Sequence, residues 1–316
     1  MSKTVRIGTR ESKLAVIQAE LVAAAIRGFD PDIVVELVKI KTTGDIILDK
    51  TLDKIGGKGL FVKELDTALL SGKVDICVHS YKDVPADISP EIPVVAVSPR
   101  EDARDVLILP LGADVLDPGK PIGCSSRRRQ VQLRELFPGQ GIEPVRGIVI
   151  TRLEKLDRGE FSALTLAAAG IRRLGLWERC SRVFSPDEML PSACQGILAI
   201  QGRRGEDHGY LGRYNDVDAM DASLAERAFI QRLGCGCGAP VGVYAELDGD
   251  KLWLRGMIGV SAEGTISAEG TISAEGTVPA GGTCEDGVVR RDEVSGDRKD
   301  AVILGELLAE KMGEVL

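Results

Sequence analysis

Lys82 and Asp83 place a cation beside a carboxylate, directly after a stretch with the pattern of a buried strand. Residues 74–79 alternate apolar and polar side chains with the period of two that is typical of β-strands. Ligands of open α/β sheets bind beyond the carboxyl ends of the strands, so this pair would lie at a binding site if the sheet is parallel. A surface ion pair before a turn is an equally good interpretation of this stretch alone.

Cationic side chains recur where a predicted strand gives way to a predicted helix. Free N–H groups of a first helical turn and arginine side chains both attract anions. In a parallel sheet these turns converge on one edge, where the cations would form a pocket for an anionic ligand. A solvated charged face is the competing interpretation. The residues concerned are Arg10 with Ser12, Arg127 to Arg129 after Ser126, Arg146, Arg152 and Arg173.

Two thiols, Cys235 and Cys237, alternate with glycines. Glycines beside a thiol let the backbone approach a bulky group, and a thiolate is a good nucleophile, so a covalent role for one of them is open. A structural zinc site needs four ligands, and the histidines number only two, so no metal is expected. A small buried apolar residue is the simplest interpretation of Cys77, Cys180, Cys194 and Cys284.

The glycine-rich run 56–59 precedes a predicted helix but lacks the spacing of a phosphate-binding P-loop, so we expect a flexible loop that carries Lys58. No dinucleotide-binding glycine pattern follows the first strand, and no serine–histidine–aspartate set is evident. The remaining set is a carboxylate, several cations and a thiol. It suits a substrate with several carboxylates whose reacting centre becomes positive, a charge that Asp83 could stabilise.

Composition limits the classes of function. The 316 residues suffice for two or three domains, and 44% hydrophobic with 28% charged residues is ordinary for a globular protein. A net charge of −8 argues against general affinity for nucleic acid. We expect a cytoplasmic protein with reduced thiols and no membrane partner, because no secretory h-region and no run of 18 apolar residues is found.

Hydrophobic periodicity predicts two α/β units followed by an α+β module. Ser12 is expected to cap the helix 14–28, and Ser125 and Ser126 to cap the next unit's first helix. The six-residue repeat in 261–277 is too short for a solenoid and is expected to be an exposed, mobile hairpin loop. The predicted strands are 5–8, 34–40, 74–79, 92–98, 105–109, 121–124, 161–167, 197–201, 241–247 and 251–260; further helices are predicted at 60–70, 126–138, 151–157, 219–233 and 298–315.

Taken together, these motifs resemble the porphobilinogen deaminase (hydroxymethylbilane synthase) family over essentially the whole chain. The motifs are Gly8 to Ser12, Thr43 to Asp45, Gly56 to Leu65, Val78 to Pro85, Ser125-Ser126 with Arg128-Arg129, Arg146-Gly147, Thr151 to Leu153, Pro191 to Gly196, and Gly236-Cys237.

The resemblance implies two domains like type II periplasmic binding proteins with a cleft between them, and a C-terminal α+β domain. The implied bounds are 1–98 with 196–215, 102–192, and 217–316. It also implies a dipyrromethane cofactor joined to Cys237 by a thioether and made from the enzyme's own substrate. Four porphobilinogen units would be added in turn with loss of ammonia, and water would release the tetrapyrrole. A monomer that passes its product to the next tetrapyrrole enzyme is expected.

Matching positions imply roles for individual residues. Asp83 would be the catalytic carboxylate that stabilises cationic intermediates. The implied cofactor-binding residues are Lys82, Asp83, Ser126, Arg128, Arg129, Arg152, Arg173 and Gln195, with Cys237 as the covalent attachment point. The implied substrate-binding residues are Arg10, Ser12, Lys58, Arg146 and Arg152.

Four positions depart from the family pattern and bear on carboxylate binding. Cys124 stands where threonine is usual, Ile148 where asparagine is usual and Ser162 where aspartate is usual, while Arg127 replaces an apolar residue. The main rival function is a hinge-type protein that binds a small anion without chemistry. It would explain the arginines but neither the third domain nor the Gly-Cys-Gly run. A redox or metal-binding thiol protein is a more distant alternative.

Overall fold

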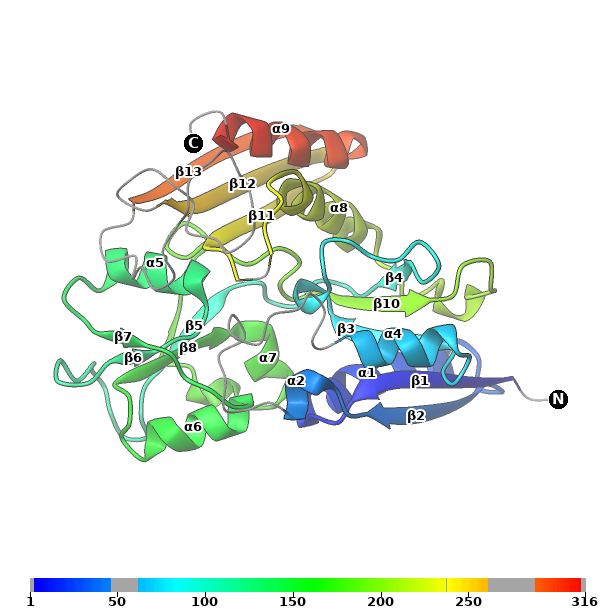
Figure 1. Cartoon of the computed structure of the whole chain (residues 1–316), viewed down its shortest axis with the longest axis horizontal. Helices are drawn as coiled ribbons and strands as arrows, with labels where there is room; N and C mark the ends of the chain where they lie inside the picture. The colour runs from blue at the N-terminus through cyan, green and yellow to red at the C-terminus, as the bar shows by residue number, and fades with distance from the viewer. Residues whose placement is uncertain (1–2, 47–61, 237, 261–287, 314–316) are drawn as a thin grey trace. The chain divides into compact units, whose positions relative to one another are not determined.

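The computed structural model describes residues 3–46, 62–236, 238–260 and 288–313, which form three β-sheets in two compact units (Figure 1). The first unit comprises residues 1–103, 167–178 and 195–220, and the second comprises residues 104–166, 179–194 and 221–316. None of the helices in the described ranges is long and apolar enough to cross a membrane.

The first unit is built on a five-stranded sheet with the order β2-β1-β3-β10-β4. Strands β1, β2 and β3 run parallel, whereas β10 is antiparallel to both β3 and β4. The sheet is therefore parallel on one side of the predicted site, from β3 to β2, and antiparallel on the other, where β10 lies, so the parallel sheet that the argument for Lys82 and Asp83 assumed is only partly present. The strands span Thr4–Arg10 (β1), Val34–Ile40 (β2), Ile76–Ser80 (β3), Val94–Val97 (β4) and Leu198–Gly202 (β10).

Helices α1 (Lys13–Phe29) and α4 (Lys63–Leu70) cover opposite faces of this sheet. Ile76 and Val78 pack with the α1 side of the core, while Cys77 packs with Leu65 of α4. This alternation explains why the predicted strand is buried on both faces. The predicted helix 60–70 is described only from Lys63, and a short helix, α2 (Thr43–Ile46), follows β2.

The Ser12 cap is confirmed, because its side chain accepts a hydrogen bond of 3.3 Å from the backbone N–H of Ala15. Gly8, four residues earlier in the chain, lies close to the neighbouring strand: a Cβ there would come within 2.8 Å of the Cys77 sulfur. The sequence at the end of β1 therefore fixes both the start of α1 and the close approach of β1 to β3.

The second unit contains a five-stranded sheet with the order β7-β6-β8-β5-β9. Strand β6 runs parallel to β7 and β8, and β5 pairs antiparallel with β9. The sequence places a strand end at Val145 to Gly147, whereas β7 already ends at Glu143, and the two-residue strand β9 was not predicted. The bounds are Asp105–Ile108 (β5), Ile122–Gly123 (β6), Ile142–Glu143 (β7), Ala163–Ala167 (β8) and Arg182–Val183 (β9), with helices Arg127–Leu136 (α5) and Val149–Asp157 (α6).

A three-stranded antiparallel sheet with helices α8 (Val217–Arg232) and α9 (Ala301–Gly313) completes the second unit. Its strands are β11 (Val241–Asp248), β12 (Lys251–Val260) and β13 (Val288–Asp297). Strand β13 was not predicted, because its residues are mostly polar and none is fully buried. Val260 pairs directly with Val288, and the repeat 261–277 lies outside the described residues.

The two helices of this module cross closely, since a Cβ on Gly305 would come within 2.3 Å of the Ala225 carbonyl oxygen. Phe229 of α8 and Leu308 of α9 are both fully buried in the core that the sheet shares with the helices (Figure 1). Any side chain larger than glycine at position 305 would therefore force the helices apart.

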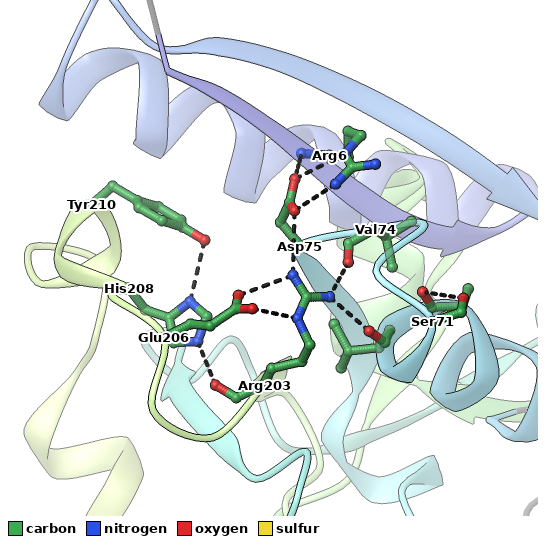
Figure 2. A network of polar contacts seen from close by, with 10 residues as sticks. Arg6, Ser71, Val74, Asp75, Arg203, Glu206, His208 and Tyr210 are labelled. Atoms are coloured by element: carbon green, nitrogen blue, oxygen red, sulfur yellow. Dashed lines mark hydrogen bonds and ion pairs between the residues drawn. The ribbon is translucent and has the colours of Figure 1, made fainter.

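An ionic network joins the first unit's strands at the end opposite Asp83 (Figure 2). The Asp75 carboxylate accepts hydrogen bonds from the backbone N–H of Arg6 (2.7 Å), from its side chain (3.1 and 2.9 Å) and from Arg203 (3.4 Å). Arg203 also donates to the carbonyl oxygens of Leu69 and Val74 and pairs with Glu206. Burial alone would raise the pKa of Asp75, but the bonds from Arg6 and the two positive charges outweigh it, and the pKa is lowered.

We predict that Asp75→Asn lowers the free energy of unfolding by about 1–3 kcal/mol at pH 7, because Arg6 and Arg203 lose the part-buried carboxylate that they share. Asp75 has a lowered folded-state pKa, so its contribution is present above the unfolded pKa of about 4 and is lost as the pH falls through the folded value. Denaturant titrations of both proteins at several pH values would measure this. Glu20→Gln, which removes an exposed partner of Arg27, is the control. Equal stabilities of wild type and Asp75→Asn at pH 7 would contradict the prediction.

Candidate functional site

Lys82 and Asp83 lie in a single 3₁₀ turn, Tyr81–Asp83, at the carboxyl end of β3. Tyr81 is buried and its backbone N–H bonds to the carbonyl of Ile197, which anchors the turn to the chain leading into β10. Asp83 is exposed, and Lys82 is half-buried and donates to the side-chain oxygen of Gln195 at 3.2 Å. The pair therefore lies where the sequence predicted it.

Three cations of the first unit contact the turn at Gln195 and Gly196. The Gln195 amide is buried and donates to the Ala103 carbonyl at 2.7 Å, while its backbone carbonyl accepts from Arg100 at 3.0 Å. The Gly196 carbonyl accepts from Arg173 Nη2 at 2.6 Å. Burial lowers the pKa of Arg173. Three of the predicted residues, Lys82, Arg173 and Gln195, are thus brought together.

Arg100 is a contact residue that the sequence argument did not single out. Its contact with Gln195 joins residues 95 positions apart, and no local pattern could have shown it.

Arg10 is the last residue of β1, and Ser12 caps the helix that follows, so both occupy the expected strand-to-helix turn. His79 of β3 is buried, and burial together with the charge of Arg10 lowers its pKa to about 4. A buried imidazole that is neutral at pH 7 fits a structural role better than a catalytic one.

In the second unit, Arg128 and Arg129 of α5 surround the carboxylate of Asp105, the first residue of β5. Arg128 Nη1 lies 2.8 Å from one carboxylate oxygen, and Arg129 donates to the other from Nε (3.1 Å) and Nη2 (2.8 Å). All three side chains are buried. Burial would raise the pKa of Asp105, but the two guanidinium groups outweigh it and hold that pKa far below its ordinary value.

The helices that begin beside these arginines are not capped by side chains. Ser126 occupies the N-cap of α5 without a capping bond, and Ser125 instead bonds the carbonyl and N–H of Val145 at 2.7 and 3.0 Å. Ser126 therefore occupies the predicted N-cap position without a capping bond, and the predicted capping role of Ser125 is wrong. Ile148, at the N-cap of α6, has no group that could cap. Both helix N-termini consequently keep N–H groups and a positive dipole end for an anion.

Arg146 and Arg152 flank the start of α6. The Arg152 Nε donates to the Gly147 carbonyl at 2.7 Å, and burial lowers the pKa of Arg152, as do the charges of Arg129 and Arg146. Gly147 has a φ of 111°, which explains the glycine in the Arg-Gly pair. The second unit therefore collects five predicted residues: Ser126, Arg128, Arg129, Arg146 and Arg152.

Of the departures from the family pattern, Cys124 lies nearest this cluster. It is buried, its thiol lies 3.7 Å from the Ser126 carbonyl, and burial raises its pKa. Ser162 precedes β8, and its hydroxyl donates a hydrogen bond to the Pro121 carbonyl. It lies three residues before Thr165, whose carbonyl accepts a hydrogen bond from Arg129. Ile148 is exposed and Arg127 is half-buried. Cys124 is thus the departure best placed to affect anion binding.

Most of the described thiols are inaccessible. Cys77, Cys124, Cys194 and Cys235 are buried and Cys180 is half-buried, as the interpretation of Cys77 and Cys194 as buried apolar residues requires. Burial raises the pKa of Cys77, Cys124 and Cys235. Two predicted site residues, Lys58 and Cys237, lie outside the described residues, as does Cys284.

Comparison with known families decides the identity of the chain. Residues 5–210 match the model described as "Porphobilinogen deaminase, dipyromethane cofactor binding domain", and residues 220–314 match "Porphobilinogen deaminase, C-terminal domain". The chain belongs to the porphobilinogen deaminase family. It is accordingly an enzyme, a transferase of the hydroxymethylbilane synthase type, and its first 210 residues contain a cofactor-binding domain for dipyrromethane. The rival interpretation as a hinge-type binding protein is not favoured.

Relatives named porphobilinogen deaminase support membership of this family. A porphobilinogen deaminase of Acetivibrio thermocellus is 58% identical over 252 residues, which are 80% of this chain and 86% of the relative. The enzyme of Ruminiclostridium josui is 51% identical over 312 residues, 98% of each chain. That of Roseiflexus castenholzii is 42% identical over 316 residues, 99% of this chain and 96% of the relative.

We predict that Gly196→Ala severely destabilises the first unit, by more than about 3 kcal/mol. Gly196 has a φ of 94°, and a Cβ would lie 2.1 Å from the Glu101 carbonyl oxygen. Gly205→Ala is the matched control, because its φ of 82° is similar and no atom lies within 4 Å of the added Cβ. It should cost only about 1 kcal/mol. Thermal unfolding compares the two, and equal losses of stability would contradict the steric argument.

Proposed function

We propose that the chain condenses four porphobilinogen molecules stepwise onto a dipyrromethane primer bound covalently at Cys237, with loss of ammonia at each addition. Water then releases hydroxymethylbilane. The observation that carries this proposal is a local cluster of cations in the second unit: Arg128 and Arg129 share one buried carboxylate, Arg129 and Arg146 lie within electrostatic range of Arg152, and the nearby helices α5 and α6 begin without side-chain caps. Such a set suits a ligand with several carboxylates.

The donor groups fit the dipyrromethane, which supplies the primer to which new pyrrole units are joined. Ser126, Arg128, Arg129 and Arg152 would bind its carboxylates from the second unit, and Lys82, Arg173 and Gln195 from the first. Arg10, Ser12, Lys58, Arg146 and Arg152 would bind the carboxylates of the incoming substrate. Most of the described residues among these lie at a strand end or near a helix start, Gln195 lies in the 195–196 turn, and Arg173 ends the helix Ala168–Arg173 and contacts that turn.

Asp83 would supply the negative charge that the reaction needs. Loss of ammonia from porphobilinogen leaves an azafulvene-like cation, and a carboxylate close to the pyrrole N–H would stabilise it. Asp83 is exposed at the end of β3, on a turn held by a buried tyrosine, which is a rigid support for a group that must keep its position.

Cys237 is the proposed point of attachment. The support from the described residues is indirect: Cys77, Cys124, Cys194 and Cys235 are buried, and a buried thiol reacts poorly. The glycines at 236 and 238 are exposed, and a Cβ at either would meet no atom within 4 Å.

Further features remain predictions from the family resemblance. They are the division into three domains at 1–98 with 196–215, 102–192 and 217–316, a cleft between the first two, a monomeric state, a cytoplasmic location and transfer of the product to the next tetrapyrrole enzyme. No metal, nucleic acid or membrane partner is part of the proposal.

We predict that denaturing mass spectrometry of the active protein gives a mass above that of the sequence by one dipyrromethane. Cys237→Ala should give the unmodified mass and no turnover, because no thioether can form. Cys180→Ala, which removes a half-buried thiol, is the control and should keep the adduct. An unmodified mass for fully active wild-type protein would refute covalent attachment.

We predict that Asp83→Asn keeps the fold and the covalent cofactor but lowers kcat by about 100-fold or more, because the cation loses its counter-charge. Steady-state formation of hydroxymethylbilane and the mass of the protein would be measured together. Asp87→Asn makes the same change of charge at a nearby exposed residue and should retain activity. A kcat for Asp83→Asn within a few-fold of wild type would exclude the proposed role.

A further inference from the structure

Asp105 is a completely buried carboxylate to which neither the sequence motifs nor the family resemblance assigned a role. It is the first residue of β5, and its contacts lie within the second unit. Arg128 and Arg129 both bind it, so the three buried side chains carry two positive charges and one negative charge. A carboxylate with no exposure is retained in a fold only when such partners compensate its loss of water.

The geometry leaves part of the Arg128 guanidinium committed and part available. Arg128 uses a single nitrogen, Nη1, for both Asp105 (2.8 Å) and the Leu190 carbonyl (2.6 Å). Within the described residues, its Nε–Nη2 edge has no hydrogen-bond partner. That edge is the planar fork that binds a carboxylate through two parallel hydrogen bonds.

Arg129 is fixed on two sides. Its Nε and Nη2 donate to one oxygen of Asp105 at 3.1 and 2.8 Å, and its Nη1 donates to the Thr165 carbonyl at 3.2 Å. The two arginines are adjacent in α5, and without an anion between them their charges would repel and push the side chains apart. Asp105 therefore determines both where the two charges lie and how they are oriented.

Two further arginines of the second unit act electrostatically on this cluster. Arg146 and Arg152 lie close enough for their charges to affect one another, and that of Arg129 affects Arg152. Burial lowers the pKa of Arg128, and Asp105 opposes that effect. The carboxylate of Asp105 thus faces two guanidinium groups, and a ligand with several carboxylates would add negative charge beside them.

We propose that Asp105 is a positioning residue for the dipyrromethane: it holds the free edge of Arg128, and Arg129 beside it, in the orientation that receives a cofactor carboxylate. This rests on the proposed function, since it concerns the same ligand. In this role two properties of Asp105 matter, its negative charge and the position of its carboxylate oxygens. Substitutions can change each of them independently.

Asp105→Asn removes the charge and nearly preserves the shape, and Asp105→Glu keeps the charge and moves the oxygens by one methylene. Each full-length apoprotein is incubated with porphobilinogen, and the rate of covalent attachment is followed by mass and expressed per folded molecule from circular dichroism. Thermal midpoints of the apoproteins are also measured in chloride and in sulfate at equal ionic strength. Glu135→Gln, on the same helix but in an exposed pair with Arg291, is the matched control.

We expect Asp105→Asn to lower the apoprotein midpoint in chloride by about 5–10 °C, because two buried guanidinium groups lose their anion. Sulfate should raise its midpoint at least about twice as much as that of wild type, because the cluster is then more positive. Attachment should nevertheless be slower by about tenfold to a hundredfold, because the guanidinium groups are misplaced. Asp105→Glu should respond to sulfate as wild type does and still attach the cofactor slowly.

A purely structural role predicts a lower midpoint with the wild-type response to sulfate and the wild-type attachment rate per folded molecule. If Asp105→Asn gave these three results, the proposal would be overturned. A wild-type rate of cofactor attachment in Asp105→Glu would overturn it as well. If the wild-type apoprotein gained no mass from porphobilinogen, the proposed function itself would fail, and the two failures are therefore distinguishable.

Discussion

The structure depends on holding positive charges close together where little water is available to screen them. Arg128 and Arg129 are buried at the start of α5, an end of a helix that disfavours cations, and the N-termini of α5 and α6 have no side-chain caps. Asp105 compensates part of this charge. The positive charge that Asp105 does not compensate attracts anions. This explains why a ligand with several carboxylates suits the site better than a neutral one.

The first unit meets a related requirement with backbone oxygens. The carbonyls of Gln195 and Gly196 accept hydrogen bonds from Arg100 and Arg173, and the Gln195 side chain accepts one from Lys82. These are neutral partners, so they orient the cations without cancelling their charge. In the proposed function, Asp83 at the neighbouring turn supplies the opposite charge for a cationic intermediate.

Local patterns in the sequence predicted those parts of the structure that local forces determine. The Ser12 cap, the two-faced burial of β3 and the place of Lys82 and Asp83 at its end all follow from short-range periodicity and capping chemistry. Contacts between distant segments were not predictable. The ion pairs of Asp105 join residues 23 and 24 positions apart, β10 is inserted antiparallel beside β3, and Ser125 bonds Val145 instead of capping a helix. Strand β13 was missed because its polar residues carry no apolar alternation.

In the proposed reaction, one polycarboxylate chain grows by single units while it stays bound to the protein. Denaturing mass spectrometry of the enzyme, mixed with less porphobilinogen than one full turnover requires, would observe this growth. We expect a ladder of covalent species above the holoenzyme, each heavier by one porphobilinogen less ammonia. Free product accompanied by protein of a single, unchanged mass at every substrate ratio would contradict it.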